Sequence, residues 1–148
     1  MTKWKLSAFS NAPRIADFGL RIADCGFKLL MTQDELKKRT KEFALRVIKL
    51  VESFPKTFLG RHVGGQLIRS GTSVPANYRA ACRAKSNADF IAKMGIVEEE
   101  ADESAFWIEL AVDSALVKLD LVTDLLDETN QLVAIFVSSI NTARGRTR

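Results

Sequence analysis

Hydrophobic positions recur every three or four residues along most of this chain, which is the period of an amphipathic α-helix. The first such stretch ends before Pro55, because a proline pushes the residue that precedes it out of the α-helical region. The pattern predicts four helices, near residues 33–54, 57–84, 87–115 and 119–143. No alternation of useful length predicts a β-strand. Short connections force neighbouring helices to run antiparallel, so the predicted fold is all-α, an up-down-up-down four-helix bundle.

Residues 1–30 differ from the rest of the chain. Residues 14–20 are repeated almost unchanged as residues 21–27, and each copy carries a glycine. We interpret residues 1–30 as an N-terminal arm outside the fold, either a misassigned start ahead of Met31 or a disordered segment. The predicted organisation is therefore an arm over 1–30, a bundle over 31–144 and a basic tail over 145–148.

The predicted first and fourth helices carry more apolar residues than one stripe each. We expect a single bundle core to need about one stripe per helix, so the surplus predicts a closed homo-oligomer. On the first helix the second stripe is Ala44, Ile48 and Val51. The two stripes of the fourth helix are Val122, Leu126, Val133, Phe136 and Ile140, and Leu121, Leu125, Leu132 and Ile135.

Charge is distributed unevenly along the chain. Residues 37–93 contain 13 Lys and Arg against 3 Asp and Glu, whereas residues 98–128 contain 11 Asp and Glu against one Lys. Two amphipathic halves that neutralise each other would explain this pattern, and so would a basic face that meets phosphate. Near the end of the second helix, Arg79, Arg83 and Lys85 have no obvious acidic partner and are the candidate nucleic-acid contacts. Compensation of the helix dipole is the alternative role for them.

An unusual string, residues 66–78, contains Gly71 and Pro75 inside a predicted helix, where both residues are unfavourable. If the second and third helices meet near residue 86, Arg69 lies beside Glu99 and Glu103. We therefore expect a largely buried ion pair between these helices. Asn77 is expected to satisfy the backbone near the Pro75 irregularity.

Other kinds of chemistry find little support in the residues. His62 is the only histidine, no Glu precedes it by three residues, and no catalytic or metal site is predicted. No cofactor and no enzymatic activity are expected. Cys25 and Cys82 are isolated thiols, which favours a reduced, cytoplasmic setting. The longest apolar run is far shorter than the ~20 residues of a membrane span.

Four segments stand in a fixed order along the chain: Phe54-Pro55, residues 66–77, Ser86 with Asp89-Phe90, and residues 98–107 ending in Phe106-Trp107. Together they resemble the bacterial four-helix-bundle proteins first noted as open reading frames in intervening sequences of large-subunit ribosomal RNA genes. The resemblance implies a four-helix bundle, often a homopentamer with a central pore. Relatives in that family accompany the reverse transcriptases of diversity-generating retroelements, where the bundle binds enzyme and RNA.

The resulting hypothesis is a non-enzymatic, cytoplasmic, oligomeric bundle that binds structured RNA or a ribonucleoprotein through a basic surface. No aromatic platform lies among the basic residues, so sequence-specific reading of RNA is not expected. The alternative is a protein-binding adaptor or assembly subunit with no nucleic-acid role. Binding that weakens with salt through counterion release would distinguish the first hypothesis from the second.

Overall fold

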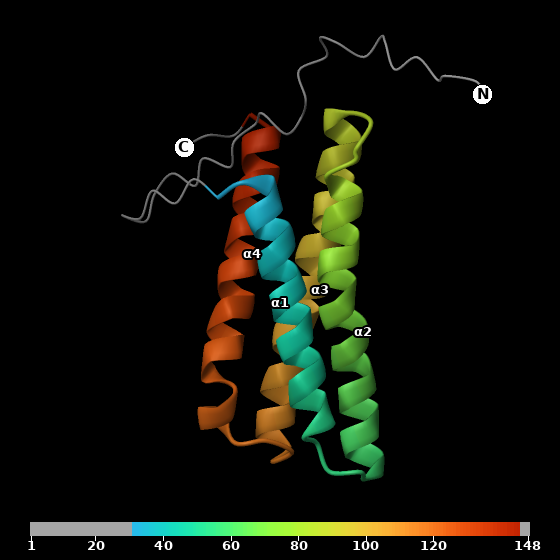
Figure 1. The fold of residues 1–148 in the computed structure, drawn as a ribbon, viewed down its shortest axis with the longest axis vertical. Helices are drawn as coiled ribbons and strands as arrows, with labels where there is room; N and C mark the ends of the chain where they lie inside the picture. The colour runs from blue at the N-terminus through green and yellow to red at the C-terminus, as the bar shows by residue number, and fades with distance from the viewer. Residues whose placement is uncertain (1–30, 146–148) are drawn as a thin grey trace, which may run out of the picture.

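The computed structural model describes residues 31–145, so the predicted N-terminal arm and the last three residues lie outside it. Its helices are α1 (Gln33–Glu52), α2 (Phe58–Ala81), α3 (Asn87–Asp113) and α4 (Thr123–Ala143), with a 3₁₀ turn, Leu119–Leu121, before α4. Each helix runs opposite to the one before it (Figure 1). The predicted antiparallel four-helix bundle is confirmed. Within residues 31–145 there is no β-strand, and no helix is long and apolar enough to cross a membrane.

Side chains cap the N-termini of three of the helices. At α1, the Thr32 hydroxyl accepts a bond from the Glu35 N–H at 3.2 Å, and the Glu35 carboxylate accepts one from the Thr32 N–H at 2.6 Å, which completes a capping box. Thr57 caps α2 and Ser86 caps α3 in the same way with a hydroxyl. These polar residues explain why α1, α2 and α3 begin where they do.

The α1 and α2 helices approach closely because two glycines of α2 face valines of α1. A Cβ placed on Gly71 would lie 2.8 Å from Val47 Cγ1, and one on Gly64 would lie 2.7 Å from Val51 Cγ1. Both distances are too short for real carbon atoms, so only glycine permits this spacing. The close approach therefore joins the C-terminal half of α1 to the first half and middle of α2, and the two antiparallel helices separate toward the N-terminus of α1 (Figure 1).

The second apolar stripe of α4, which the sequence pattern indicated to be surplus, is mostly buried within the single chain. Both stripes of α4 contribute to the core, and only Leu121, at 75% exposed, points fully to solvent. A helix in a bundle contacts two neighbours and the diagonal helix, so its apolar face is wider than one stripe. The homo-oligomer stays a prediction, but the apolar stripes of α4 no longer support it, because the single chain already buries most of their residues. Fully buried large side chains include Leu36, Phe43, Val47, Leu67, Met94, Ile108, Leu132 and Phe136.

An ion pair joins α1 to α4. The Arg39 guanidinium donates two bonds to the Glu128 carboxylate, at 2.7 and 2.9 Å, and a third to the Gln131 side-chain oxygen at 2.8 Å. The Arg39 and Glu128 side chains are only 23% and 17% exposed. This two-pronged contact between the first and last helices was not predicted from the sequence.

Candidate functional site

An open groove of about 780 Å³ runs between the N-terminal half of α1 and the C-terminal half of α2. Three residues of its lining, Thr72, Pro75 and Ala76, have small side chains and leave the groove open. Longer side chains stand on either side. The full lining is Gln33, Lys37, Lys38, Lys41, Thr72, Pro75, Ala76, Arg79, Cys82 and Arg83.

The groove is strongly basic, with five cationic residues in its lining and no carboxylate. Lys37 has local partners, since its ammonium lies 3.0 Å from Asp34 Oδ1 and 3.2 Å from the Gln33 side-chain oxygen. Within residues 31–145, Lys41, Arg79 and Arg83 have no ion-pair or hydrogen-bond partner for their charged ends. These three cations are available to an external anion.

The cations of the groove come from α1 and from the end of α2. Lys37 and Lys41 are four residues apart on α1 and so lie on one face of it, whereas Arg79 is in the last turn of α2 and Arg83 is in the turn that follows the helix. The rise of an α-helix separates Lys37 and Lys41 by about 6 Å along the axis. Cations of α1 therefore line the groove together with cations from the end of α2.

A thiol lies in the same lining. Burial raises the pKa of Cys82 above the usual value for a thiol, and this effect outweighs the opposing influence of nearby Lys37. The thiol therefore remains neutral at physiological pH and does not reduce the positive charge of the groove.

A second groove, of about 390 Å³, lies between α1 and α4 and has mixed charge. Its cations Lys38, Arg39 and Arg46 stand beside Glu35, Glu42 and Glu128. Carboxylates and cations in equal number neutralise each other, so this groove is a poorer site for an anion than the α1–α2 groove.

The structure brings together two of the three predicted nucleic-acid contacts. Arg79 and Arg83 line the α1–α2 groove, whereas Lys85 lies beyond the end of α2 and outside the lining. The Lys85 backbone N–H donates to Asp89 Oδ2 at 2.9 Å, which holds that residue in the turn to α3. The lysines of α1 were not predicted, because Arg79, Arg83 and Lys85 were identified by their spacing along one helix alone. The register of the α1–α2 pair would have indicated them.

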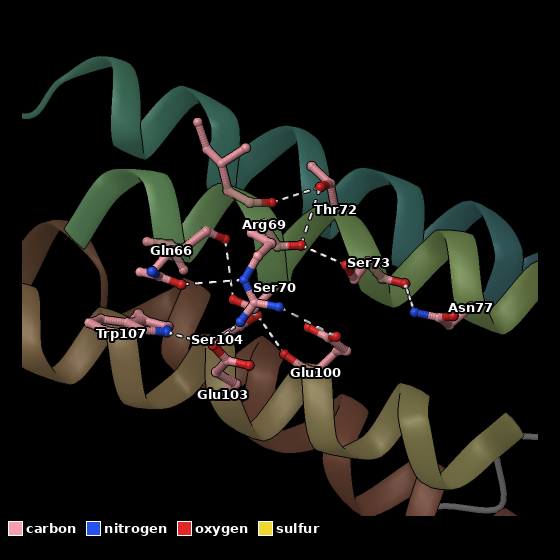
Figure 2. Close-up of polar contacts among 12 residues, drawn as sticks. Gln66, Arg69, Ser70, Thr72, Ser73, Asn77, Glu100, Glu103, Ser104 and Trp107 are labelled. Atoms are coloured by element: carbon pink, nitrogen blue, oxygen red, sulfur yellow. Dashed lines mark hydrogen bonds and ion pairs between the residues drawn. The ribbon is translucent and has the colours of Figure 1, made fainter. Parts of the chain in front are cut away.

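A polar network joins α2 to α3 in the middle of the bundle (Figure 2). The Arg69 guanidinium forms an ion pair with Glu103 and lies 3.8 Å from Glu100 Oε1. The Trp107 indole N–H donates to the same Glu103 carboxylate at 3.0 Å. Below these contacts, the buried hydroxyls of Ser70 and Ser104 are hydrogen-bonded at 3.0 Å.

Two details of the predicted Arg69 pair are wrong. The Arg69 side chain is 54% exposed rather than largely buried, and it contacts Glu100 in place of Glu99, which is exposed. The buried contact between the helices is made by the neighbouring Ser70, and this places Arg69 at the edge of the interface. Pairing with Glu103 is as the predicted register indicated.

Asn77 contacts its own helix, where its side-chain N–H donates to the Ser73 carbonyl at 3.0 Å. Thr72 and Ser73 likewise donate to the carbonyls of Ile68 and Arg69, each at 2.7 Å. Pro75 has no N–H, so it leaves the carbonyl of Gly71, four residues before it, without a helical donor. None of these three side chains bonds to that carbonyl, so the predicted role of Asn77 at the Pro75 irregularity is wrong. The helix continues through Pro75.

The pKa values of the two carboxylates in the network shift in opposite directions. The bond from the Trp107 indole lowers the pKa of Glu103, and Arg69 acts in the same direction. Burial raises the pKa of Glu100, which outweighs the effect of Arg69. Its Oε2 atom is buried without a hydrogen-bond partner in the described part of the chain. The network therefore joins two helices around a partly satisfied carboxylate.

Comparison with known proteins gives one family. Residues 33–138 match the 23S rRNA-intervening sequence protein family. The chain belongs to this family. The match covers the helices that build the α1–α2 groove and the α2–α3 network, and it includes every segment on which the resemblance rested. Among curated proteins, none matches the chain.

A solved structure agrees with this assignment. The crystal structure of a protein with unknown function from the S23 ribosomal protein family of Bacteroides thetaiotaomicron is similar, with 31% sequence identity and a TM-score of 0.66. The similarity covers 71% of this chain and 97% of that chain. The relative shares the fold and has no function in its description.

Proposed function

We propose that this protein binds structured RNA, and that it does so by holding phosphates in the α1–α2 groove. The observation that carries the proposal is the composition of the lining, which has five cations and no carboxylate. Lysine and arginine side chains that neutralise phosphates supply most of the affinity of non-specific nucleic-acid binding. The family name, which refers to an intervening sequence of 23S rRNA, supports RNA as the partner.

The groove favours contact with the backbone over contact with bases. No aromatic side chain lines it, so it offers no surface on which an unpaired base could stack. Cations from α1 and from the end of α2 instead suit a sugar–phosphate strand. Contacts of this kind position an RNA without reading its sequence. The role proposed is therefore binding of a folded RNA or a ribonucleoprotein in the cytoplasm, with no catalytic step.

The test measures how affinity for an RNA hairpin depends on salt. We expect fluorescence anisotropy to detect binding by the full chain at about 50 mM salt, where phosphate contacts are strongest. Replacing Lys41, Arg79 and Arg83 with glutamine should reduce the salt slope by about 2.7. That change corresponds to about a 40-fold difference in affinity between 50 and 200 mM salt.

A matched control removes the same charge elsewhere. Lys49, Lys56 and Lys118 are exposed, lie outside the groove and have no ion-pair partner within residues 31–145. Their triple glutamine variant should keep most of the affinity. Equal loss in both triple variants would mean that only net charge matters, and the groove would have no special role.

Lys85 provides a finer comparison because it lies close to the groove in sequence but outside its lining. Lys85→Gln should change the salt slope less than Arg83→Gln. If the unaltered protein shows no affinity for RNA at about 50 mM salt, the RNA proposal fails. The alternative, a protein-binding adaptor whose groove takes an acidic partner, would then take its place.

A further inference from the structure

Four aromatic rings form a continuous surface strip across α2 and α3, which we call the aromatic patch: Phe58, His62, Phe106 and Trp107. Phe58 stacks on His62 with ring centroids 6.3 Å apart, and His62 meets the edge of Trp107 at 6.2 Å. Phe106 packs edge-on against Trp107 at 5.0 Å. Phe58 is 80% exposed and Phe106 is 52% exposed, which are high values for such large apolar side chains.

The network beneath the patch holds it in place. The indole N–H of Trp107 is bonded to Glu103, and Arg69 holds that carboxylate from α2 (Figure 2). The contacts between rings are the offset and edge-to-face arrangements that aromatic pairs prefer. A rigid aromatic surface loses little conformational entropy when it binds a partner. Exposed aromatic clusters of this kind are typical of the centres of protein interfaces.

Carboxylates border the patch along α3. Asp102 and Glu109 lie four residues before and three residues after Phe106, so they flank it on the helix surface. Glu99 and Asp113 extend the same exposed face by one turn in each direction. None of these four carboxylates has an ion-pair partner in the described part of the chain.

The α2 side of the patch has a different character. Arg61 follows the first turn of α2, but its guanidinium donates to the Lys56 carbonyl at 2.7 Å and is thereby held to the preceding loop. That bond leaves the charge of Arg61 in place, so the α2 border of the patch is basic and only the border along α3 is acidic. The acidic border along α3 repels the phosphates of RNA and attracts a cation.

We propose that the aromatic patch docks an arginine-rich segment of a partner protein. Guanidinium groups stack on aromatic faces and also form two-pronged bonds with carboxylates, and this surface offers both kinds of contact side by side. The patch lies at the end of the bundle where α2 begins, whereas the basic groove lies toward the end where α2 terminates. A protein segment and an RNA can therefore occupy the molecule together, and the proposal does not depend on the RNA-binding role.

The experiment measures binding of a fluorescein-labelled nona-arginine peptide to the full chain by anisotropy, with nona-lysine as a probe of equal charge. We expect nona-arginine to bind more tightly, because lysine stacks less well on aromatic rings. The double variant Phe58→Ala with Phe106→Ala should weaken nona-arginine binding at least about tenfold, as loss of central interface aromatics does. Because both side chains are exposed, circular dichroism should show an unchanged helical fold.

Two further variants separate aromatic from electrostatic contributions. Leu45→Ala with Val137→Ala removes exposed apolar groups from α1 and α4, at 56% and 40% exposure, and should leave the peptide affinity unchanged. Asp102→Asn with Glu109→Gln keeps the rings but removes charge from the border, and should also weaken nona-arginine binding.

Three results would overturn the proposal. The first is equal peptide affinity in the unaltered protein and the Phe58/Phe106 variant, which would indicate diffuse charge attraction alone. The second is loss of RNA affinity in that variant to the same degree as in the groove variant, which would assign the patch to RNA. The third is a fall in particle size by light scattering in that variant with no change in peptide binding, which would make a second copy of the chain the occupant.

Discussion

Replacing Arg39 with methionine removes the only two-pronged ion pair between helices within residues 31–145, while much of the apolar stem is retained. The change breaks two bonds to Glu128, at 2.7 and 2.9 Å, and one to Gln131 at 2.8 Å. Glu128 is then left largely buried, at 17% exposed, without its partner. We expect α4 to be held less firmly against α1.

The magnitude follows from the burial of the pair. Exposed ion pairs contribute about 0–1 kcal/mol, and loss of one partner of a fully buried pair costs about 3–5 kcal/mol. Arg39 and Glu128 keep about a fifth of their exposure, so we expect a loss of about 2 kcal/mol for Arg39→Met. For a domain of this size, that loss lowers the melting temperature by about 8 °C.

Thermal unfolding followed by circular dichroism measures this change, with Arg69→Met as the matched control. The Arg69 side chain is 54% exposed, so its replacement should cost under about 1 kcal/mol. A double-mutant cycle with Glu128→Gln should show that the Arg39 and Glu128 effects are coupled. The reasoning is refuted if Arg69→Met destabilises the protein as much as Arg39→Met, or if Arg39→Met costs under about 0.5 kcal/mol.

Two further predictions concern packing and assembly. Gly71→Ala would place a methyl group 2.8 Å from Val47 and should cost about 1–3 kcal/mol in urea unfolding. Gly65→Ala meets nothing within 4 Å and should stabilise α2 by up to about 1 kcal/mol, so a gain in both variants would contradict the tight α1–α2 contact. Light scattering at micromolar concentration should report a homo-oligomer, with a pentamer expected from the family resemblance. A particle of 16.5 kDa would contradict that expectation.

Helix positions could be predicted because their causes are local. The predicted third helix, 87–115, is observed as Asn87–Asp113, and the Ser86 hydroxyl caps it by accepting from the Asp89 N–H. The cap is not a complete capping box, because the Asp89 carboxylate accepts from the Lys85 N–H and not from the Ser86 N–H. Gly145 follows α4 with φ of +69°, a left-handed conformation that glycine adopts without strain.

Contacts between helices were predicted less well. Counting residues from the turn at Ser86 placed Arg69 beside Glu103, but it also placed Glu99 where the structure has Glu100. Residues one position apart on a helix differ by about 100° around its axis, so a small error in register changes which side chains meet. Burial of Arg69 was overestimated for the same reason, because its neighbour Ser70 occupies the centre of the interface.

The sequence by itself determined the four helices, their order and antiparallel course, and the family to which they belong, because periodicity, caps and prolines act over a few residues. Only the tertiary structure decided which faces meet. The packing of Gly71 on Val47 sets α1 against α2, and this contact gathers Lys41, Arg79 and Arg83 into one groove. The tertiary structure likewise pairs Arg39 with Glu128, which are 89 residues apart in the sequence. Such groupings depend on the rotation and register of whole helices, which the close packing of side chains selects.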